Sequence, residues 1–207
     1  FHIRYTVILC NMNIIFILYS NKMDTKQIVV IGDVMLDIYH HCKTTRNAPE
    51  VDIPIYKIHD TNYVLGGASN VSKNLSMLFQ EHSSVKVSLI SIIGDDESGK
   101  IVKEMMRDDL LTTKLYVDPQ RPTTQKIRMI HENKIVGRFD IESSVDITET
   151  IQNEVYDFLT KMTNIHSIVL SDYAKGFLTP TLCQRIIEFA NANRIFTYVD
   201  PKPFHPN

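Results

Sequence analysis

The stretch ISIIGDDESGKIVKEMM, residues 90–106, runs from an apolar strand through a glycine-bounded turn into a helical pattern. Its segment 94–100 (GDDESGK) has the spacing of the phosphate-binding loop G-x-x-x-x-G-K-[ST], but Ile101 stands where that loop needs a hydroxyl for Mg²⁺. Such a loop binds phosphates through backbone N–H groups and a lysine, and the three carboxylates within this segment would repel them. We therefore predict an ordinary strand–turn–helix unit in which Asp96 caps the helix.

The same alternation of strand and helix patterns extends in both directions from this unit. Further strands are expected at 27–33, 85–94, 113–118, 167–172 and 195–200, and helices at 66–79, at about 97–109, after Asp146–Glu149 and after Thr179–Pro180. Repeated strand–helix–strand units predict right-handed crossovers and a mostly parallel sheet between helices, which is an α/β fold. Two segments, about 37–60 and 123–140, instead have the pattern of antiparallel strand pairs and predict an addition to the sheet or a small separate β layer.

The composition is that of a globular domain with one sizeable core: of 207 residues, 43% are hydrophobic and 22% are charged. The formal net charge of −2 and the lack of a dense Lys/Arg run argue against a nucleic-acid partner. Cys10, Cys42 and Cys183 are odd in number and far apart, so they make neither a disulfide framework nor a paired zinc spacing. We expect a reducing compartment and a cytoplasmic location.

The first 22 residues differ in character from the rest of the chain. Tyr5–Ser20 is apolar enough to suggest a leader or a membrane anchor. It is shorter than the ~20 residues that span a bilayer, and Asn11 and Asn13 interrupt it. We expect residues 1–22 to be an extension or leader and the folded domain to run from Met23 to Asn207; a membrane anchor is the alternative.

Polar residues follow four of the expected strands: Gly32–Asp33, Gly94–Asp96, Ser171–Asp172 and Asp200–Lys202. In open α/β sheets, ligands bind at the carboxyl ends of the strands. Because those ends meet along one edge of a parallel sheet, we expect these residues to form a ligand site there.

Seven motifs occur in a fixed order: VVIGDVMLD (29–37), APEVDIPIYKI (48–58), LGGASNVSKNLSML (65–78), GDDESG (94–99), GRFDIE (137–142), LSDYAKG (170–176) and VDPK (199–202). Together they resemble the ribokinase/PfkB-type carbohydrate kinases and, within that group, the heptose-7-phosphate kinases of ADP-heptose synthesis. The resemblance covers Gln27 to about Lys202 and implies a ribokinase-like sandwich with a small β lid. It also implies transfer of a phosphoryl group from ATP, with Mg²⁺, to the anomeric hydroxyl of a heptose 7-phosphate.

The resemblance places the sugar against Asp33 and the start of the helix expected at 66–79. Asp33 would accept hydrogen bonds from sugar hydroxyls, and the alternative is a turn aspartate that caps a loop. Gly66 and Gly67 allow a ligand to approach the backbone closely, and Asn70 offers both a donor and an acceptor. The alternative for the two glycines is a tight turn into the helix.

A phosphorylated sugar needs cations for its distal phosphate, preferably a bidentate arginine. Arg128, Arg138 and Asp140 lie on the segment 123–140 and are the candidate contacts, and Lys126 shares strand-face parity with Arg128. The alternative is that these residues are solvated charges on a strand.

Four residues of the SDYAKG and DPK motifs are candidates for contact with the phosphates of ATP, because phosphoryl transfer needs lysines and metal-linked carboxylates: Asp172, Lys175, Asp200 and Lys202. No residue is assigned as a metal ligand. His40 and His41 are adjacent on an expected strand and therefore point to opposite faces, so they are poorly placed to share an ion.

The chain departs from the family pattern after VDPK. The family carries an N-x-x-E element and a G-A-G-D motif whose aspartate is the catalytic base, and neither occurs before Asn207. The resemblance therefore implies a kinase without its C-terminal part, no assignable catalytic residue and negligible activity of these 207 residues alone. Two functions stay open: a fragment of an active sugar kinase, and an inactive sugar-binding remnant that forms a homodimer through its lid.

Overall fold

The computed structural model describes residues 25–107 and 111–202. The apolar segment 5–20 and the expected start at Met23 lie outside the described residues. Within the two described ranges, no helix combines the length and the apolar character needed to cross a lipid bilayer.

In the part of the chain that the structure describes, the core is a five-stranded parallel sheet in the order β5-β4-β1-β8-β9. Its strands are β1 (Lys26–Gly32), β4 (Val85–Ile93), β5 (Leu111–Val117), β8 (Ile165–Ser171) and β9 (Phe196–Asp200). Each lies close to its predicted limits. In β1, β4 and β8 the signal is a run of Val, Ile and Leu between polar turns, which marks a strand buried on both faces. The prediction of an α/β fold is confirmed.

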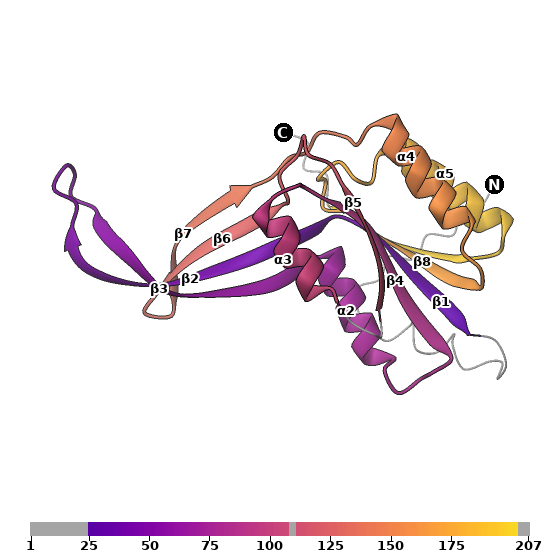
Figure 1. Ribbon diagram of the computed structural model, residues 1–207, viewed down its shortest axis with the longest axis horizontal. Coiled ribbons are helices and arrows are strands. Elements are labelled where there is room, and N and C mark those ends of the chain that lie inside the picture. Colours follow the sequence, from indigo (N-terminus) through magenta and orange to yellow (C-terminus); the bar gives the residue numbers. More distant parts are fainter. Residues whose placement is uncertain (1–24, 108–110, 203–207) are drawn as a thin grey trace.

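Helices cover both faces of this sheet (Figure 1). They are α2 (Ala68–Leu78) and α3 (Glu97–Met105) on one side, and α4 (Glu149–Thr160) and α5 (Pro180–Ala192) on the other. A hydrophobic core lies on each side of the sheet, and alternate residues of β1 belong to one or the other. Ile28 and Val30 pack with α2 and α3, whereas Val29 and Ile31 pack with α4 and α5. The three layers hold the carboxyl ends of β1, β4, β8 and β9 along one edge.

The described residues also form a second sheet of four strands, in the order β3-β2-β6-β7. It gathers β2 (Val34–Asn47), β3 (Pro54–Gly67), β6 (Gln125–His131) and β7 (Lys134–Ile141), and in Figure 1 it projects away from the helices. The β2–β6 pair is parallel, and the β2–β3 and β6–β7 pairs are antiparallel. We call this sheet the lid sheet; it contains the two segments in which strand pairs were expected.

Local signals in the sequence account for several element boundaries. Asp96 caps α3, since its side chain accepts a hydrogen bond from the Gly99 N–H at 2.7 Å, so the predicted cap is confirmed. Thr179 caps α5, as predicted from Thr179–Pro180. The cap predicted for α4, Asp146, was wrong. Thr148 caps this helix, since its hydroxyl accepts a hydrogen bond from the N–H of Ile151.

Candidate functional site

Asp33 lies between β1 and β2, at the edge where the strands of the core sheet end. Its side chain accepts backbone hydrogen bonds from Tyr173 at 2.9 Å, from Lys175 at 3.2 Å and from Phe177 at 3.3 Å. Only 2% of the residue is exposed. Burial raises the pKa of Asp33, and the three backbone hydrogen bonds offset only part of that increase. Of the two roles considered for Asp33, this geometry matches the aspartate that caps a loop.

Gly66 and Gly67 end β3 beside this carboxylate, and α2 starts at the next residue. A side-chain carbon at Gly66 would overlap a carboxylate oxygen of Asp37, and one at Gly67 would overlap the carbonyl oxygen of Asp33. Gly67 also has a φ of 59°, in the left-handed region that favours glycine. Gly67 therefore lets the lid sheet pack closely against Asp33 at the end of β1, and Gly66 leaves room for Asp37 and Met35 of β2.

Asp37 and Arg128 form an ion pair on one face of the lid sheet. The Arg128 Nη1 lies 2.5 Å from the Asp37 Oδ1, and both side chains are largely buried. The guanidinium of Arg128 also lies over the ring of Tyr39, 5.1 Å from its centroid. Arg128 is therefore held at a fixed position near Gly66.

Further ion pairs follow one another along the same face of the lid sheet and reach Lys175 in the loop after β8. Arg138 binds Asp140 through two hydrogen bonds of 2.7 Å, and Lys126 Nζ lies 3.6 Å from Asp140 and 3.9 Å from Glu142. Glu142 in turn lies 2.7 Å from the ammonium of Lys175, which comes from the loop after β8. The hydrogen bonds of Arg138 lower the pKa of Asp140 to about 2.

Asp172 directly follows β8, and Asp200 is the last residue of the neighbouring strand β9. The N–H of Asp172 donates to the carbonyl oxygen of Asp200 at 3.0 Å, and the Asp172 side chain accepts from the N–H of Ala174 at 2.7 Å. Asp200 and Lys202 are exposed at this edge. Asn70 is also exposed, on the first turn of α2, where its side-chain oxygen accepts from Asn74 at 3.4 Å.

Arg121 is a residue of this site that sequence reasoning missed. It bonds to Asp118 at 3.2 Å, to the carbonyl oxygen of Lys175 at 3.1 Å and to that of Val145 at 2.8 Å. Glu142 was also missed, although it ends the GRFDIE motif, and Asp37, which ends the VVIGDVMLD motif, was not among the predicted contacts. Asp37 and Glu142 could have been found as the acidic ends of motifs that also carry predicted contacts.

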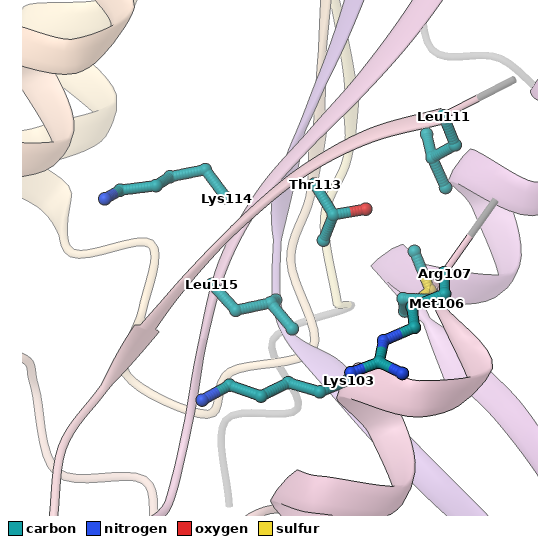
Figure 2. Close-up of a pocket in the computed structure, with 7 residues that line it drawn as sticks. All are labelled: Lys103, Met106, Arg107, Leu111, Thr113, Lys114 and Leu115. Atoms are coloured by element: carbon teal, nitrogen blue, oxygen red, sulfur yellow. The ribbon is translucent and has the colours of Figure 1, made fainter. Parts of the chain in front are cut away.

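Of two cavities, one lies away from the edge where the strands end and one lies at it. A cavity of about 590 Å³ lies between α3 and β5 and is lined by Lys103, Met106, Arg107, Leu111, Thr113, Lys114 and Leu115 (Figure 2). It opens at the end of α3 and along the first residues of β5, away from the carboxyl ends of the strands. A cavity of about 10 Å³ lies at those ends, and Asp33, Arg121, Ser143 and Lys175 are among its lining residues. The second cavity belongs to the site.

The arrangement suits a small ligand that carries both hydroxyls and a phosphate. Carboxylates can accept hydrogen bonds from hydroxyls. Arg128, Lys126 and Lys175 supply positive charge, and the two lysines lie near the same carboxylate, that of Glu142. Such a set, placed under a lid sheet at the carboxyl ends of parallel strands, has the layout of a substrate site.

Comparison with known proteins agrees with this layout. Residues 25–205 match the pfkB family of carbohydrate kinases. The chain is 38% identical over 177 residues to the bifunctional protein HldE of Aliarcobacter butzleri, covering 84% of this chain and 36% of that protein. It is 39% identical over 178 residues to HldE of Campylobacter jejuni, covering 85% of this chain and 36% of that protein. The chain thus spans little more than a third of the length of these relatives.

Among solved structures, the ribokinase of Giardia lamblia has a similar fold. It superimposes with a TM-score of 0.61 and 15% sequence identity, over 89% of this chain and 53% of that one. The five-stranded parallel sheet between helices is therefore the ribokinase-like core, as expected from the sequence. By sequence match and by fold, the chain belongs to the pfkB family of carbohydrate kinases, which are phosphotransferases.

Proposed function

We propose that the chain forms the sugar-binding part of an ATP-dependent kinase that phosphorylates a heptose 7-phosphate at its anomeric hydroxyl. The reaction would be a step of ADP-heptose synthesis in the cytoplasm. Family membership and the similarity to HldE proteins support a sugar kinase. The similarity of the GDVMLD and LSDYAKG motifs to those of heptose-7-phosphate kinases supports the choice of substrate.

One observation carries the proposal: cations and a hydroxyl acceptor share the face of the lid sheet above the strand ends. Asp37, beside Gly66, would accept hydrogen bonds from sugar hydroxyls, since no side chain at Gly66 blocks it. Arg128 and Lys126 are the cations of the lid sheet, and Lys175 is the cation of the core. A sugar that carries a phosphate would satisfy both groups at once.

The residues present also fit the phosphates of a nucleotide with its metal. Asp172 and Asp200 provide carboxylate oxygens at adjacent strand ends, which is the ligand type that Mg²⁺ prefers, and Lys202 provides a cation for phosphate. When bound, Mg²⁺ and ATP would supply the phosphoryl group and neutralise its charge. The part played by this chain is to hold the sugar and to exclude water beneath the lid sheet.

The proposal is tested by calorimetry with the 207-residue chain and heptose 7-phosphate, alongside an assay of ATP turnover. We expect binding that weakens about tenfold or more in Arg128→Met, because a hydrogen-bonded charge pair is lost. Heptose without phosphate is the matched ligand control and should bind more weakly than the phosphorylated sugar. Equal affinity for both ligands, or no binding by a folded sample, would contradict the assignment.

We also propose that the lid sheet pairs with a second copy of the chain, because apolar side chains stay exposed on its other face. Tyr63 is 43% exposed and Phe139 57% exposed, and cross-strand pairing places both on the face opposite Asp37 and Arg128. Light scattering should give the mass of a dimer for the wild type and of a monomer for Phe139→Glu. Binding without turnover is the result expected of these 207 residues alone, and turnover would contradict that expectation.

A further inference from the structure

The loop between β8 and α5 follows a tightly curled path. Ala174 has a φ of 55° and Gly176 a φ of 79°, both in the left-handed region. Alanine rarely adopts this conformation, so something outside the residue must hold it there. The curl turns the N–H groups of Tyr173, Lys175 and Phe177 toward one point, which is the carboxylate of Asp33.

A ring of backbone N–H groups of this kind is an anion-binding concavity. In many proteins the anion is a ligand, but here it is a carboxylate of the same chain. Both carboxylate oxygens are used: one accepts from Tyr173 and Lys175, and the other accepts from Phe177. With 2% of the residue exposed, little of the carboxylate is left for a sugar hydroxyl.

The other side of the loop is fixed by different contacts. The carbonyl oxygen of Gly176 accepts from the N–H of Ile147 at 2.9 Å, and Arg121 binds the carbonyl oxygen of Lys175 at 3.1 Å. A side-chain carbon at Gly176 would overlap the carbonyl oxygen of Val145. The loop is therefore held between Asp33 on the inside and the segment 145–147 on the outside.

This clamp determines where the ammonium of Lys175 lies. The side chain of Lys175 is 10% exposed, and its Nζ lies 2.7 Å from Glu142 at the base of the lid sheet. Because the backbone of Lys175 bonds to Asp33 through its N–H and to Arg121 through its carbonyl oxygen, the side chain starts from a fixed point.

We infer that Asp33 is a positioning residue, which holds the loop 173–177 in its curled form so that Lys175 can reach the phosphate of a bound sugar phosphate. It acts through the loop backbone and does not bind a sugar hydroxyl itself. The identity of the ligand rests on the function proposed above, whereas the clamp rests on geometry alone.

Amide hydrogen exchange of the 207-residue chain tests the clamp without any ligand. Asp33→Asn keeps the size of the side chain but leaves only one atom that can accept hydrogen bonds. The amides of Tyr173, Lys175 and Phe177 should exchange about tenfold faster or more in this variant. The amide of Gly99, held by Asp96, should keep its exchange rate and serves as the internal reference.

A double-mutant cycle then tests how Asp33 acts on binding. Calorimetry with heptose 7-phosphate would compare Asp33→Asn, Lys175→Met and the double variant. If Asp33 acts through Lys175, the double variant should bind no more weakly than Lys175→Met alone, because the two losses are not additive. A direct contact between Asp33 and the sugar would make the losses add.

The outcomes separate this inference from the proposed function. Unchanged exchange of the loop amides in Asp33→Asn, additive losses, or an affinity that does not respond to Lys175→Met would overturn the positioning role. If the wild type binds no heptose 7-phosphate, the proposed function fails, and the exchange rates alone then decide whether Asp33 holds the loop.

Discussion

Replacing Gly67 by alanine would place a methyl group against the backbone carbonyl of Asp33, an oxygen that also accepts the N–H of Ala68 at 2.9 Å. Neither partner of this overlap is a side chain that can rotate away. Gly67 has φ 59° and ψ −140°, a conformation that costs other residues about 1–3 kcal/mol. Overpacking costs about 1–3 kcal/mol more, so we expect a loss of roughly 2–6 kcal/mol in the free energy of unfolding.

Gly66→Ala is the matched control: the position is adjacent, but the added methyl group would meet side-chain atoms instead of a backbone carbonyl. Its methyl group would overlap the carboxylate of Asp37 and lie 2.7 Å from the Cγ of the buried Met35, so two side chains, and no backbone carbonyl, must shift. We expect a smaller loss of stability than in Gly67→Ala, about 1–3 kcal/mol, because only overpacking is added and Gly66 has no positive φ. Binding of heptose 7-phosphate should nevertheless fall about tenfold or more, as Asp37 is displaced.

Urea denaturation followed by circular dichroism, together with calorimetry, separates the two effects. The expected pattern is a Gly67→Ala variant that is the less stable of the two and a Gly66→Ala variant that is the more stable but binds weakly. A Gly67→Ala protein that unfolds at the wild-type urea midpoint would refute the argument from backbone conformation. So would a Gly66→Ala protein that is the less stable of the two.

Three further outcomes are expected. Asp96→Ala should lower the free energy of unfolding, measured by urea denaturation, by about 1–3 kcal/mol, because helix α3 loses its cap. Asp95→Ala, at the exposed neighbouring position, is the control and should change the free energy of unfolding by less than about 0.5 kcal/mol. Equal losses in the two variants would contradict the capping role. Glu142→Gln should tighten binding of heptose 7-phosphate several-fold in calorimetry, since Lys175 loses its carboxylate partner, and weaker binding would count against Lys175 as a phosphate contact. The pKa of Asp33 in the folded protein is raised above the unfolded value of about 3.9, so the folded protein binds the proton of Asp33 more tightly than the unfolded chain does. The stabilisation that this proton gives is fully present below pH ~3.9 and is lost as the pH rises through the folded-state pKa. Urea denaturation across this window should show the wild type losing stability relative to Asp33→Asn as pH rises, and a constant or growing advantage would refute the direction.

Much of the fold follows from local patterns. The hydrophobic runs of β1, β4 and β8 predict buried strands, and the alternation with helices predicts a parallel sheet. The Glu132–Asn133 turn, with φ values of 48° and 62°, joins the two strands of the antiparallel pair that was expected in segment 123–140. The start of α4 was misplaced because Asp146 and Thr148 are both good caps, and spacing alone cannot decide between them.

The contacts of the site were harder to predict, because they join residues far apart in the sequence. Asp33 was predicted as a site residue from the sequence, but its three partners in the loop 173–177 depend on how β1 and β8 pair. In the same way, the Asp37–Arg128 ion pair depends on β2 lying beside β6 in parallel. Sequence spacing identifies the chemical groups of a site, whereas sheet topology determines which of them meet.

The long strands of the lid sheet turn a small rotation at their base into a large displacement at their far end. Strand β2 has 14 residues and starts directly after Asp33, and β3, of equal length, ends at Gly67. At about 3.3 Å per residue, each strand is an arm roughly 45 Å long, so a rotation of about 5° at its base would move its far end by about 4 Å. A small change at the base of the lid sheet is thereby amplified at the loop 48–53, which forms the outermost point of the molecule in Figure 1. A fluorescent label on that loop would therefore report what happens at Asp33 from far outside the site.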